Sequence, residues 1–573
     1  MDTTKKQNAQ AKTYYVTTPI YYPSNRLTIG NAYTTVIADC LARYHRMLGE
    51  DVFFLTGTDE HGQKLQRKAA EKGVSPQTYV DHIVDGTVRP LWERYKISYD
   101  HFIRTTEADH MKAVQTIFNR LYEQGDITLG HYKGLYCTPC EAYWTESQLV
   151  DGKCPDCGRP VEEMQEECYF LHLSKYADRL VDYYKSHPDF IQPASRMNEM
   201  LNNFILPGLE DLAVSRTSFD WGVPVPFNPK HVTYVWLDAL SNYLTALGYP
   251  DEGGHFAKYW PADLQLIGKD ILRFHTIIWP IILMALDLPL PKQVFGHGWL
   301  LSKGEKMSKS KGNVVDPLVL GDIFGVDAIR YFLLREIQFG SDGNFSGEAL
   351  ITRVNSDLAN DLGNLLSRSV SMIVKYFPEG LPEGSRELPA THSEEETRID
   401  EDVAAVADEA FRGAGEKLQS LEISLALEQI WTFVRRLNKY IDESAPWVLA
   451  KDEGKRGQLA HVLYVLADGL RRISLLICPA MPETSAAMDE QLGLERPERQ
   501  ANSAGLQWSE AGEAGLYPLG LALKKGAALF PRMELEPTLA LMDEKAAAAA
   551  QAYEAADEAF YKEKTSEEGG SQA

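Results

Sequence analysis

The sequence lacks long apolar runs and contains few cysteines. Its richest apolar stretch, IIWPIILMAL from Ile277, is shorter than the roughly 20 residues that a membrane-spanning helix needs. The N-terminal segment MDTTKKQNAQAK has no apolar region of the signal-peptide kind. Seven cysteines, an odd number, do not favour a disulfide framework. We therefore expect a cytoplasmic protein that does not enter a membrane.

Positive charge is also scarce. The chain has 58 Lys and Arg against 81 Asp and Glu, a formal net charge of −23. This balance counts against nucleic-acid binding, because neutralising phosphates requires basic side chains. A local exception is KGEKMSKSKGN, residues 303–313, with four lysines and one acid. The acidity therefore weakens the nucleic-acid hypothesis without excluding it.

The first recognisable unit is a strand, a helix and a second strand. With 573 residues the chain must form several domains, since single cores stop growing at roughly 250–300 residues. Tyr14–Pro23 and Asp51–Gly62 have strand composition, and the run between them has helical spacing with Gly49 as its stop. Parallel strands bind ligands at their carboxyl ends, where the turn Thr28–Asn31 would present helix N-terminal amides to an anion such as phosphate. An ordinary βα loop is the simpler explanation of this turn taken alone.

The rest of the chain changes character three times. From about Tyr122 to Phe227 the alternation of strands and helices breaks, which indicates an insertion. Strand patterns return at His231 with HVTYVWLD and continue in ADLQLIGKD and QVFGHGWLL, which predicts a second α/β half. Beyond Gly347 the pattern is helical. The alanine- and acid-rich end predicts a solvated helix that frays into a disordered tail.

Four cysteines form two closely spaced pairs. Four thiolates on two tight turns can close a tetrahedron around one Zn²⁺, which leaves no open position and predicts a structural metal site. Unliganded buried cysteines are the alternative. The paired residues are Cys137, Cys140, Cys154 and Cys157, whereas Cys40, Cys168 and Cys478 are expected in the core.

A basic loop, KMSKS at Lys306–Ser310, follows the predicted strand FGHGWLL. Its lysines could neutralise the charge of a reacting triphosphate. Composition alone favours a solvated surface loop. Its pairing with the turn at Thr28–Asn31, one from each α/β half, favours a phosphate site.

At this point the sequence resembles the methionyl-tRNA synthetases, a family of class I aminoacyl-tRNA synthetases. The resemblance extends along nearly the whole chain, to about residue 535. It rests on TPIYYPSNRLTIGNAYTTVIADCLARY, FLTGTDEHGQK, the four-cysteine knuckle, YVWLDAL, IGKDILRFH, KMSKSKGN and YIDESAPWVLAK.

The resemblance implies an α/β fold in which a Rossmann-type parallel sheet is split by a zinc-binding connective insertion and followed by an α-helical bundle domain. The implied segments are 1–121 and 228–300 for the two Rossmann halves, 122–227 for the insertion, 301–346 for the KMSKS loop and stem-contact region, 347–540 for the anticodon-binding domain, and 541–573 for the acidic tail.

The resemblance also implies a reaction. The carboxylate of L-methionine attacks the α-phosphate of Mg²⁺-ATP, and the methionyl group then passes to the 3′ end of tRNA(Met). Such a ligase needs no protein nucleophile, so alignment and charge stabilisation must supply the catalysis. No C-terminal oligonucleotide-binding fold, which supports dimerisation in many members of the family, is visible in the sequence, so we expect a monomer. The four-cysteine knuckle leads us to expect one structural zinc per chain.

Site residues follow from the motifs that match. Taken singly, most of them are equally explained as core aromatics, capping acids or helix-packing residues. The methionine pocket would consist of Ile20, Tyr22, Asp59, Trp236, Ala239, Leu240, Tyr243, Ile271 and His275, with Asp59 on the α-ammonium. ATP would contact Thr28, Gly30, Asn31, Lys306, Met307, Ser308, Lys309 and Ser310, of which Thr28, Asn31, Lys306 and Lys309 would be catalytic. The anticodon would meet Asn364, Arg368, Pro446 and Trp447.

One departure from the family pattern concerns the first turn. Its signature usually reads HIGH, but Thr28 and Asn31 stand at the two histidine positions. Both can donate hydrogen bonds and neither can carry positive charge, so backbone amides and the lysines must supply that charge. Two alternatives remain: a synthetase for leucine, isoleucine or valine, which would carry a larger insertion, and a non-catalytic tRNA-binding paralogue.

Overall fold

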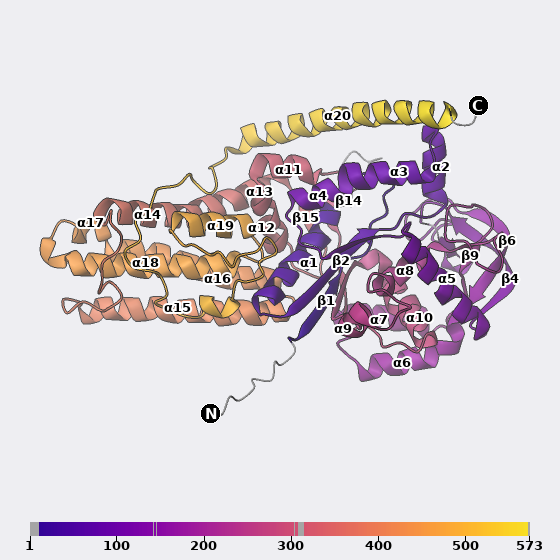
Figure 1. The fold of residues 1–573 in the computed structure, drawn as a ribbon, viewed down its shortest axis with the longest axis horizontal. Coiled ribbons are helices and arrows are strands. Elements are labelled where there is room, and N and C mark those ends of the chain that lie inside the picture. Colours follow the sequence, from indigo (N-terminus) through magenta and orange to yellow (C-terminus); the bar gives the residue numbers. More distant parts are fainter. Residues whose placement is uncertain (1–10, 141, 145, 303, 308–313, 571–573) are drawn as a thin grey trace, which may run out of the picture.

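The computed structural model describes residues 11–140, 142–144, 146–302, 304–307 and 314–570. An α/β region with an inserted small sheet forms one end of an elongated molecule, and a bundle of long helices forms the other (Figure 1). This arrangement confirms the predicted fold class.

A six-stranded parallel sheet forms the centre of the α/β region. The order is β3 (His101–Arg104), β2 (Asp51–Thr58), β1 (Thr13–Thr17), β11 (Leu264–Gly268), β12 (Val294–His297) and β7 (Ile191–Gln192). Its strands are largely buried, as expected for a sheet covered by helices on both faces. Strand β1 pairs with β2 on one side and with β11 on the other, so the two halves of the chain meet between β1 and β11. A ligand crevice is expected outside the carboxyl ends of the strands at such a switch in strand order.

The helices of this region pack around the sheet. Helix α1 (Ile29–Met47) follows β1, and the chain then passes through Gly49 at φ 78° before β2 begins. The other helices are α2 (Gln63–Lys72), α3 (Pro76–Ile83), α4 (Arg89–Arg94), α5 (Ala108–Glu123), α6 (Ala177–Ser186), α7 (Ala194–Met200), α8 (Val235–Thr245), α9 (Gly254–Tyr259), α10 (Trp279–Ala285), α11 (Pro317–Phe324) and α12 (Val326–Glu336).

The segment YVWLD differs from the prediction. We predicted a strand over HVTYVWLD, but only Val232–Thr233 (β10) is extended, where it pairs with β9 (Ser215–Arg216). The chain then enters helix α8, with Tyr234 in extended geometry at its N-cap. Val235 and Leu237 are buried on the helix and Trp236 is partly buried, because tertiary packing overrides their strand propensity.

The insertion contains a four-stranded antiparallel sheet. Its order is β5 (Ala142–Trp144), β4 (Ile127–Cys137), β6 (Glu162–Leu171) and β8 (Leu212–Ala213). Strand β7 lies within the predicted insertion but pairs with β12 in the main sheet. A two-residue strand carries no detectable alternation, so sequence periodicity could not locate this return. A third sheet joins β14 (Glu305–Lys306), β13 (Leu300–Ser302) and β15 (Gly343–Phe345).

The helical domain begins with a nearly continuous helical run. It consists of α13 (Gly347–Arg353), a π-helical stretch (Val354–Gly363) and α14 (Asn364–Tyr376). The long helices α15 (Glu394–Gln419), α16 (Ile423–Ser444) and α18 (Arg456–Ile477) follow, together with α17 (Pro446–Leu449) and α19 (Pro482–Gln491). Among the described residues, no helix combines the length and apolarity that crossing a bilayer requires.

The C-terminal helix α20 (Leu535–Gly570) lies across the α/β region (Figure 1). Asp557 pairs with Arg26 at 3.0 Å and with His82 at 2.9 Å, and the ring of Tyr561 stacks on Tyr79. The predicted helix is present as far as Gly570 and most of its side chains are exposed, as expected, whereas residues 571–573 of the expected disordered tail lie outside the described residues. The prediction did not include the face of aromatic residues that docks on the α/β region.

Candidate functional site

A cavity of about 190 Å³ lies near the carboxyl ends of β1 and β2. All nine residues expected to bind methionine line it. Five further residues complete its wall: Pro19, Pro139, Cys140, Val235 and Asn242. None of these five was assigned to methionine from the motifs, and Cys140 was expected only at the metal site. Asn242 follows Ala239 by three residues and so shares its helix face.

Aromatic and acidic side chains give this cavity its chemistry. Trp236, on α8, stacks on Phe274 with ring centroids 3.6 Å apart and an interplanar angle of 7°. Asp59 follows β2, and its backbone N–H donates to the carbonyl of Tyr21 at 3.0 Å. The cavity thus offers an apolar, aromatic surface and a carboxylate to one ligand.

A hydrogen-bonded pair, Tyr243 and His275, fixes another part of the wall. His275 Nδ1 lies 2.9 Å from the carbonyl oxygen of Ile271, which can only accept. Nδ1 therefore carries the proton, and Nε2 accepts from the Tyr243 hydroxyl at 2.8 Å. Burial lowers the pKa of His275 from 6.5 to about 4, so the imidazole is neutral at pH 7.

This neutral histidine predicts a pH dependence of stability. In the unfolded chain His275 binds its proton near pH 6.5, whereas the folded protein resists protonation down to about pH 4. Stability is therefore lost as the pH falls through this window, by about 3 kcal/mol for the whole shift. Urea unfolding at several pH values should show a shallower loss in His275→Gln than in the unsubstituted protein. Parallel curves for the two proteins would contradict this assignment.

A buried carboxylate positions helix α8 beside the cavity. Asp238 Oδ2 lies 2.7 Å from His61 Nδ1, and Oδ1 lies 2.8 Å from His110 Nε2. Burial alone would raise the pKa of Asp238, but the charge of His61 and hydrogen bonds from both histidines hold it at about 2. His61 follows β2 by three residues, so this network ties α8 to the same strand end that carries Asp59.

The turn Thr28–Asn31 is partly engaged within the chain. Asn31 Oδ1 accepts from the Thr28 amide at 2.9 Å and from its hydroxyl at 3.3 Å, which leaves the Asn31 NH₂ group to donate. The Ile29 amide donates to the carbonyl of Val315 at 3.1 Å. The Asn31 amide donates to the carbonyl of Thr28 at 3.0 Å. We expected the four amides of this turn to be available to an anion, and those of Thr28, Ile29 and Asn31 have partners in the protein.

The hydrogen bond from Ile29 to Val315 also joins two distant segments of the chain. Val315 lies five residues after KMSKS in the sequence, so the N-terminus of α1 contacts the segment that follows the basic loop. Lys306 ends β14, and Met307 packs against the main core. Ser308, Lys309 and Ser310 lie outside the described residues.

His297 is a buried residue of this region that the motifs did not identify. It ends β12, and its Nε2 accepts from the Thr34 hydroxyl of α1 at 2.7 Å. Its Nδ1 donates to the carbonyl of Gly298 at 2.7 Å, and burial lowers its pKa. The sequence FGHGWLL marked this stretch as a strand, and only the fold shows that it meets α1.

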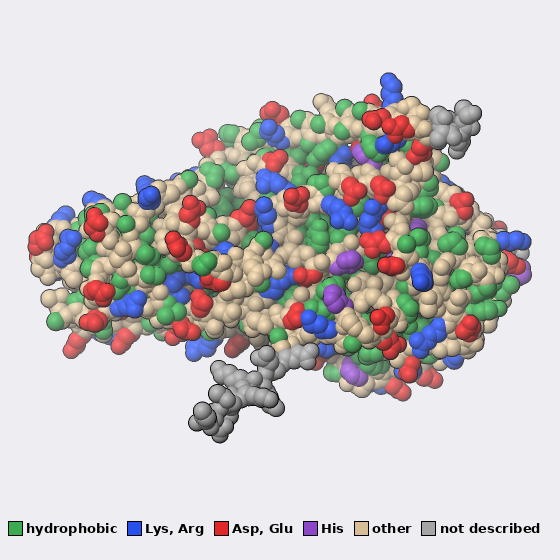
Figure 2. Space-filling model, in the orientation of Figure 1, with side chains coloured by type: hydrophobic (Ala, Val, Ile, Leu, Met, Phe, Trp, Pro, Cys, Tyr) green, Lys and Arg blue, Asp and Glu red, His purple; other side chains and the backbone are tan. Residues whose placement is uncertain are grey.

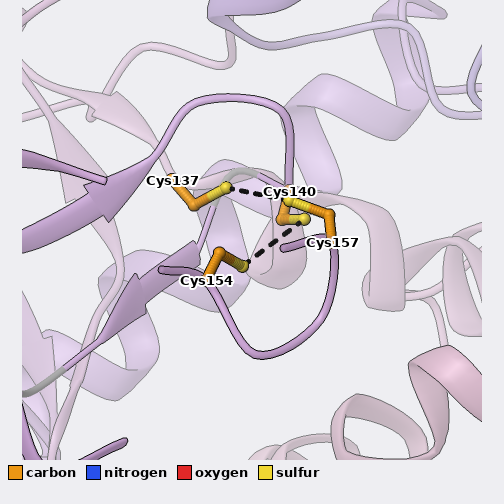
Figure 3. A group of neighbouring side chains, drawn as sticks. All are labelled: Cys137, Cys140, Cys154 and Cys157. Carbon is orange, nitrogen blue, oxygen red and sulfur yellow. Dashed lines mark hydrogen bonds between the residues drawn. The ribbon is translucent and has the colours of Figure 1, made fainter. Parts of the chain in front are cut away.

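The four paired cysteines converge on one point (Figure 3). Their Sγ atoms all lie within 4.8 Å of one another; Cys137 and Cys157 are separated by 3.5 Å, and Cys140 and Cys154 by 3.9 Å. Gly158, at φ 67°, permits the turn after the last cysteine. This cluster can hold a metal ion. Because Cys140 also lines the cavity, the cluster supports the cavity wall.

The residues expected at the anticodon gather at the end of the helical domain. Asn364 is exposed at the start of α14, and Arg368 one turn later pairs with Asp442 of α16 at 3.0 Å. Ala445, in the left-handed region at φ 41°, ends α16 and turns the chain into α17. There Pro446 is buried and Trp447 is 43% exposed. The fold thus places Arg368 close to the helix end that leads to an exposed indole.

Comparisons with known proteins agree with this geometry. The family model described as tRNA synthetases class I (M) matches residues 14–370. A methionine–tRNA ligase of Caldanaerobacter subterraneus subsp. tengcongensis is 62% identical over 535 residues, 93% of this chain and 81% of that protein. One from Clostridium perfringens is 57% identical over 533 residues, 93% of this chain and 80% of that protein.

A solved structure is also similar. Mycobacterium tuberculosis methionyl-tRNA synthetase in complex with methionyl-adenylate superposes with a TM-score of 0.83 at 43% identity, covering 91% of this chain and 100% of that one. Together with the fold, the cavity and the cysteine cluster, these matches show that the chain belongs to the methionyl-tRNA synthetase family of class I.

Proposed function

We propose that this chain is a methionine–tRNA ligase that forms methionyl-adenylate and transfers the methionyl group to tRNA(Met). The observation that carries the proposal is the cavity, because eight residues from four separate motifs line it together with Tyr243. Trp236 and Tyr243 can enclose a thioether through sulfur–aromatic contacts, and Asp59 can pair with the α-ammonium.

The chemistry follows from this placement. With the ammonium on Asp59 and the side chain in the cavity, the methionine carboxylate is free to attack the α-phosphate of ATP, and pyrophosphate leaves. Lys306 and Lys309, with the NH₂ of Asn31 and the remaining amide of the turn, that of Gly30, would stabilise the charge that develops on the phosphates. Mg²⁺ bound to ATP would supply further neutralisation. A terminal hydroxyl of tRNA then attacks the adenylate carbonyl and releases AMP.

The direct test of this function is methionine-dependent exchange between ATP and pyrophosphate. We expect exchange with methionine and far less with leucine, isoleucine or valine, whose side chains lack sulfur. Exchange driven best by one of those three would assign the chain to another apolar amino acid. Absence of exchange in a folded protein that binds tRNA would indicate a non-catalytic paralogue.

The chain must bind an acidic polymer despite its net charge of −23. On the face shown in Figure 2, acidic and basic side chains are interspersed along the helical domain. On this face the Lys and Arg side chains do not gather into a broad basic patch. We therefore propose that base stacking and local contacts recognise tRNA, with the chain acting as a monomer in the cytoplasm.

A substitution at Trp447 tests whether tRNA binding and methionine adenylation depend on different parts of the molecule. Stacking of a base on an aromatic side chain contributes about 1–3 kcal/mol, so Trp447→Ala should weaken tRNA binding roughly 5- to 150-fold. Methionine adenylation should stay nearly unchanged. The neighbouring Val448→Ala, at a residue 53% exposed, is the matched control and should alter neither step. A parallel loss of both steps in a folded Trp447→Ala variant would contradict the anticodon assignment.

We propose that the cysteine cluster binds one structural Zn²⁺. Tetrahedral coordination with Zn–S bonds of about 2.3 Å places sulfur atoms about 3.8 Å apart. The separations of 3.5 and 3.9 Å fit this geometry. Four thiolates leave no position for a substrate, so the ion would hold the knuckle and, through Cys140, one wall of the cavity.

Replacing Cys154 with Ser should release this zinc and loosen the insertion. We expect elemental analysis to show a lost zinc equivalent, limited proteolysis to cut the insertion first, and the KM for methionine to rise because Pro139 and Cys140 line the cavity. Cys168→Ser, in the same insertion but outside the cluster, is the control and should keep the metal. Full zinc content in Cys154→Ser would refute the assignment.

A further inference from the structure

A second group of metal-type ligands lies in the helical domain. His392 precedes α15, Asp400 lies in α15, and His461 lies in α18. One ligand atom from each lies within 4.8 Å of the other two. Both histidines approach the same oxygen: Asp400 Oδ2 is 2.9 Å from His392 Nε2 and 3.2 Å from His461 Nε2.

The protonation of His461 is the informative feature. Its Nδ1 lies 3.0 Å from the carbonyl oxygen of Ser385, which can only accept, so Nδ1 carries a proton. In the neutral ring, Nε2 then has no proton, and its lone pair faces a carboxylate oxygen of Asp400. Two acceptors at 3.2 Å need a cation between them, either a proton or a metal ion.

The hydrogen bonds around the cluster are those that a metal site uses. Metal-bound histidines usually donate their other N–H to a carbonyl, as His461 does to Ser385 at 3.0 Å. Carboxylate ligands are likewise held by outer hydrogen bonds, and Asp400 Oδ1 accepts from the Tyr440 hydroxyl of α16 at 2.6 Å.

The distances suit a zinc-class ion. Zn–N and Zn–O bonds of about 2.0–2.2 Å in a tetrahedron separate the ligand atoms by about 3.3–3.6 Å. The separation of 3.2 Å approaches this edge length, and that of 2.9 Å would lengthen when the ion binds. Imidazole ligands favour Zn²⁺ over the oxygen-seeking ions Mg²⁺ and Ca²⁺.

We propose that His392, Asp400 and His461 bind a second, structural Zn²⁺ ion that ties the loop before α15 to helices α15 and α18. A water molecule would complete the tetrahedron. Helix α18 also packs against α17, which carries Trp447, so the ion would stiffen the end of the domain that presents the exposed indole. This site is separate from the cysteine cluster and does not depend on the proposed activity.

The test counts zinc in the full-length protein after equilibration in a zinc-buffered solution. We expect two equivalents in the unsubstituted protein and one each in Asp400→Asn, His461→Gln and Cys154→Ser. His187→Gln, at an exposed histidine, is the matched control and should retain both. A single equivalent in the unsubstituted protein that Asp400→Asn leaves unchanged would overturn the proposal.

Two further measurements keep the test decisive if a ligand variant misfolds. Tyr440→Phe removes only the hydroxyl that orients Asp400, and it should weaken zinc binding at this site about 10- to 100-fold while the fold persists. In the cobalt-substituted protein, the first site should show thiolate charge-transfer absorption, and the second equivalent should add only the weak visible bands of nitrogen and oxygen ligands. Thiolate bands that grow with both equivalents, or zinc affinity unchanged by Tyr440→Phe, would refute the second site.

Discussion

Lys309→Ala is expected to slow methionyl-adenylate formation by a factor of about 10²–10³. Removing one donor that is aimed at developing charge typically costs about 2.7–4 kcal/mol in the transition state. The turn Thr28–Asn31 has no cationic side chain at the positions where the family usually has histidines, and three of its four amides bond within the chain. The lysines must therefore carry a larger share of the charge stabilisation.

Pre-steady-state adenylation rates would measure this loss, with Thr28→Ala as the comparison. Thr28 donates a neutral hydrogen bond, and water can replace part of it, so its variant should lose less rate. Because Thr28 is the N-cap of α1, its variant should also lose about 0.5–2 kcal/mol of stability, which unfolding must measure separately. A larger rate loss at Thr28 than at Lys309 would show that the turn dominates the phosphate chemistry.

Asp59→Asn is expected to raise the KM for methionine by roughly 30-fold to several thousand-fold. Removing one member of a buried, hydrogen-bonded charge pair costs about 2–5 kcal/mol. The substituted amide would keep the shape of the cavity wall and lose its charge. The KM for ATP should change little, which distinguishes lost recognition of the ammonium from a damaged active site. Equal increases in both KM values would argue against contact between Asp59 and methionine.

Local chemistry made parts of this fold predictable. Helix α1 has apolar residues at helical spacing and Gly49 as its stop, and it forms where that pattern indicates. The paired cysteines are equally local, since two tight turns bring four thiolates together once the intervening strand folds back. The separate motifs that line the cavity could be assigned only through resemblance, because no spacing in the sequence states that Asp59 faces Trp236.

Features that depend on tertiary contacts were beyond prediction. YVWLD has strand composition but lies in a helix, where Asp238 meets two histidines from distant segments. His297 and the cluster around Asp400 each join residues more than 60 positions apart. The periodicity of the sequence contains no information about such long-range contacts. The assignments to ATP at Ser308, Lys309 and Ser310 remain predictions.

The docking of α20 has a consequence for how this protein is made. Glu568 accepts a hydrogen bond from the Ser75 amide across 493 positions of sequence. At roughly 5–20 residues per second, a ribosome needs roughly 25–100 s to make the chain between them. During that time Tyr79 and His82 lack the aromatic partners that cover them in the finished protein. This face of the α/β region therefore stays uncovered until the residues of α20 have been translated, 493 positions later in the chain.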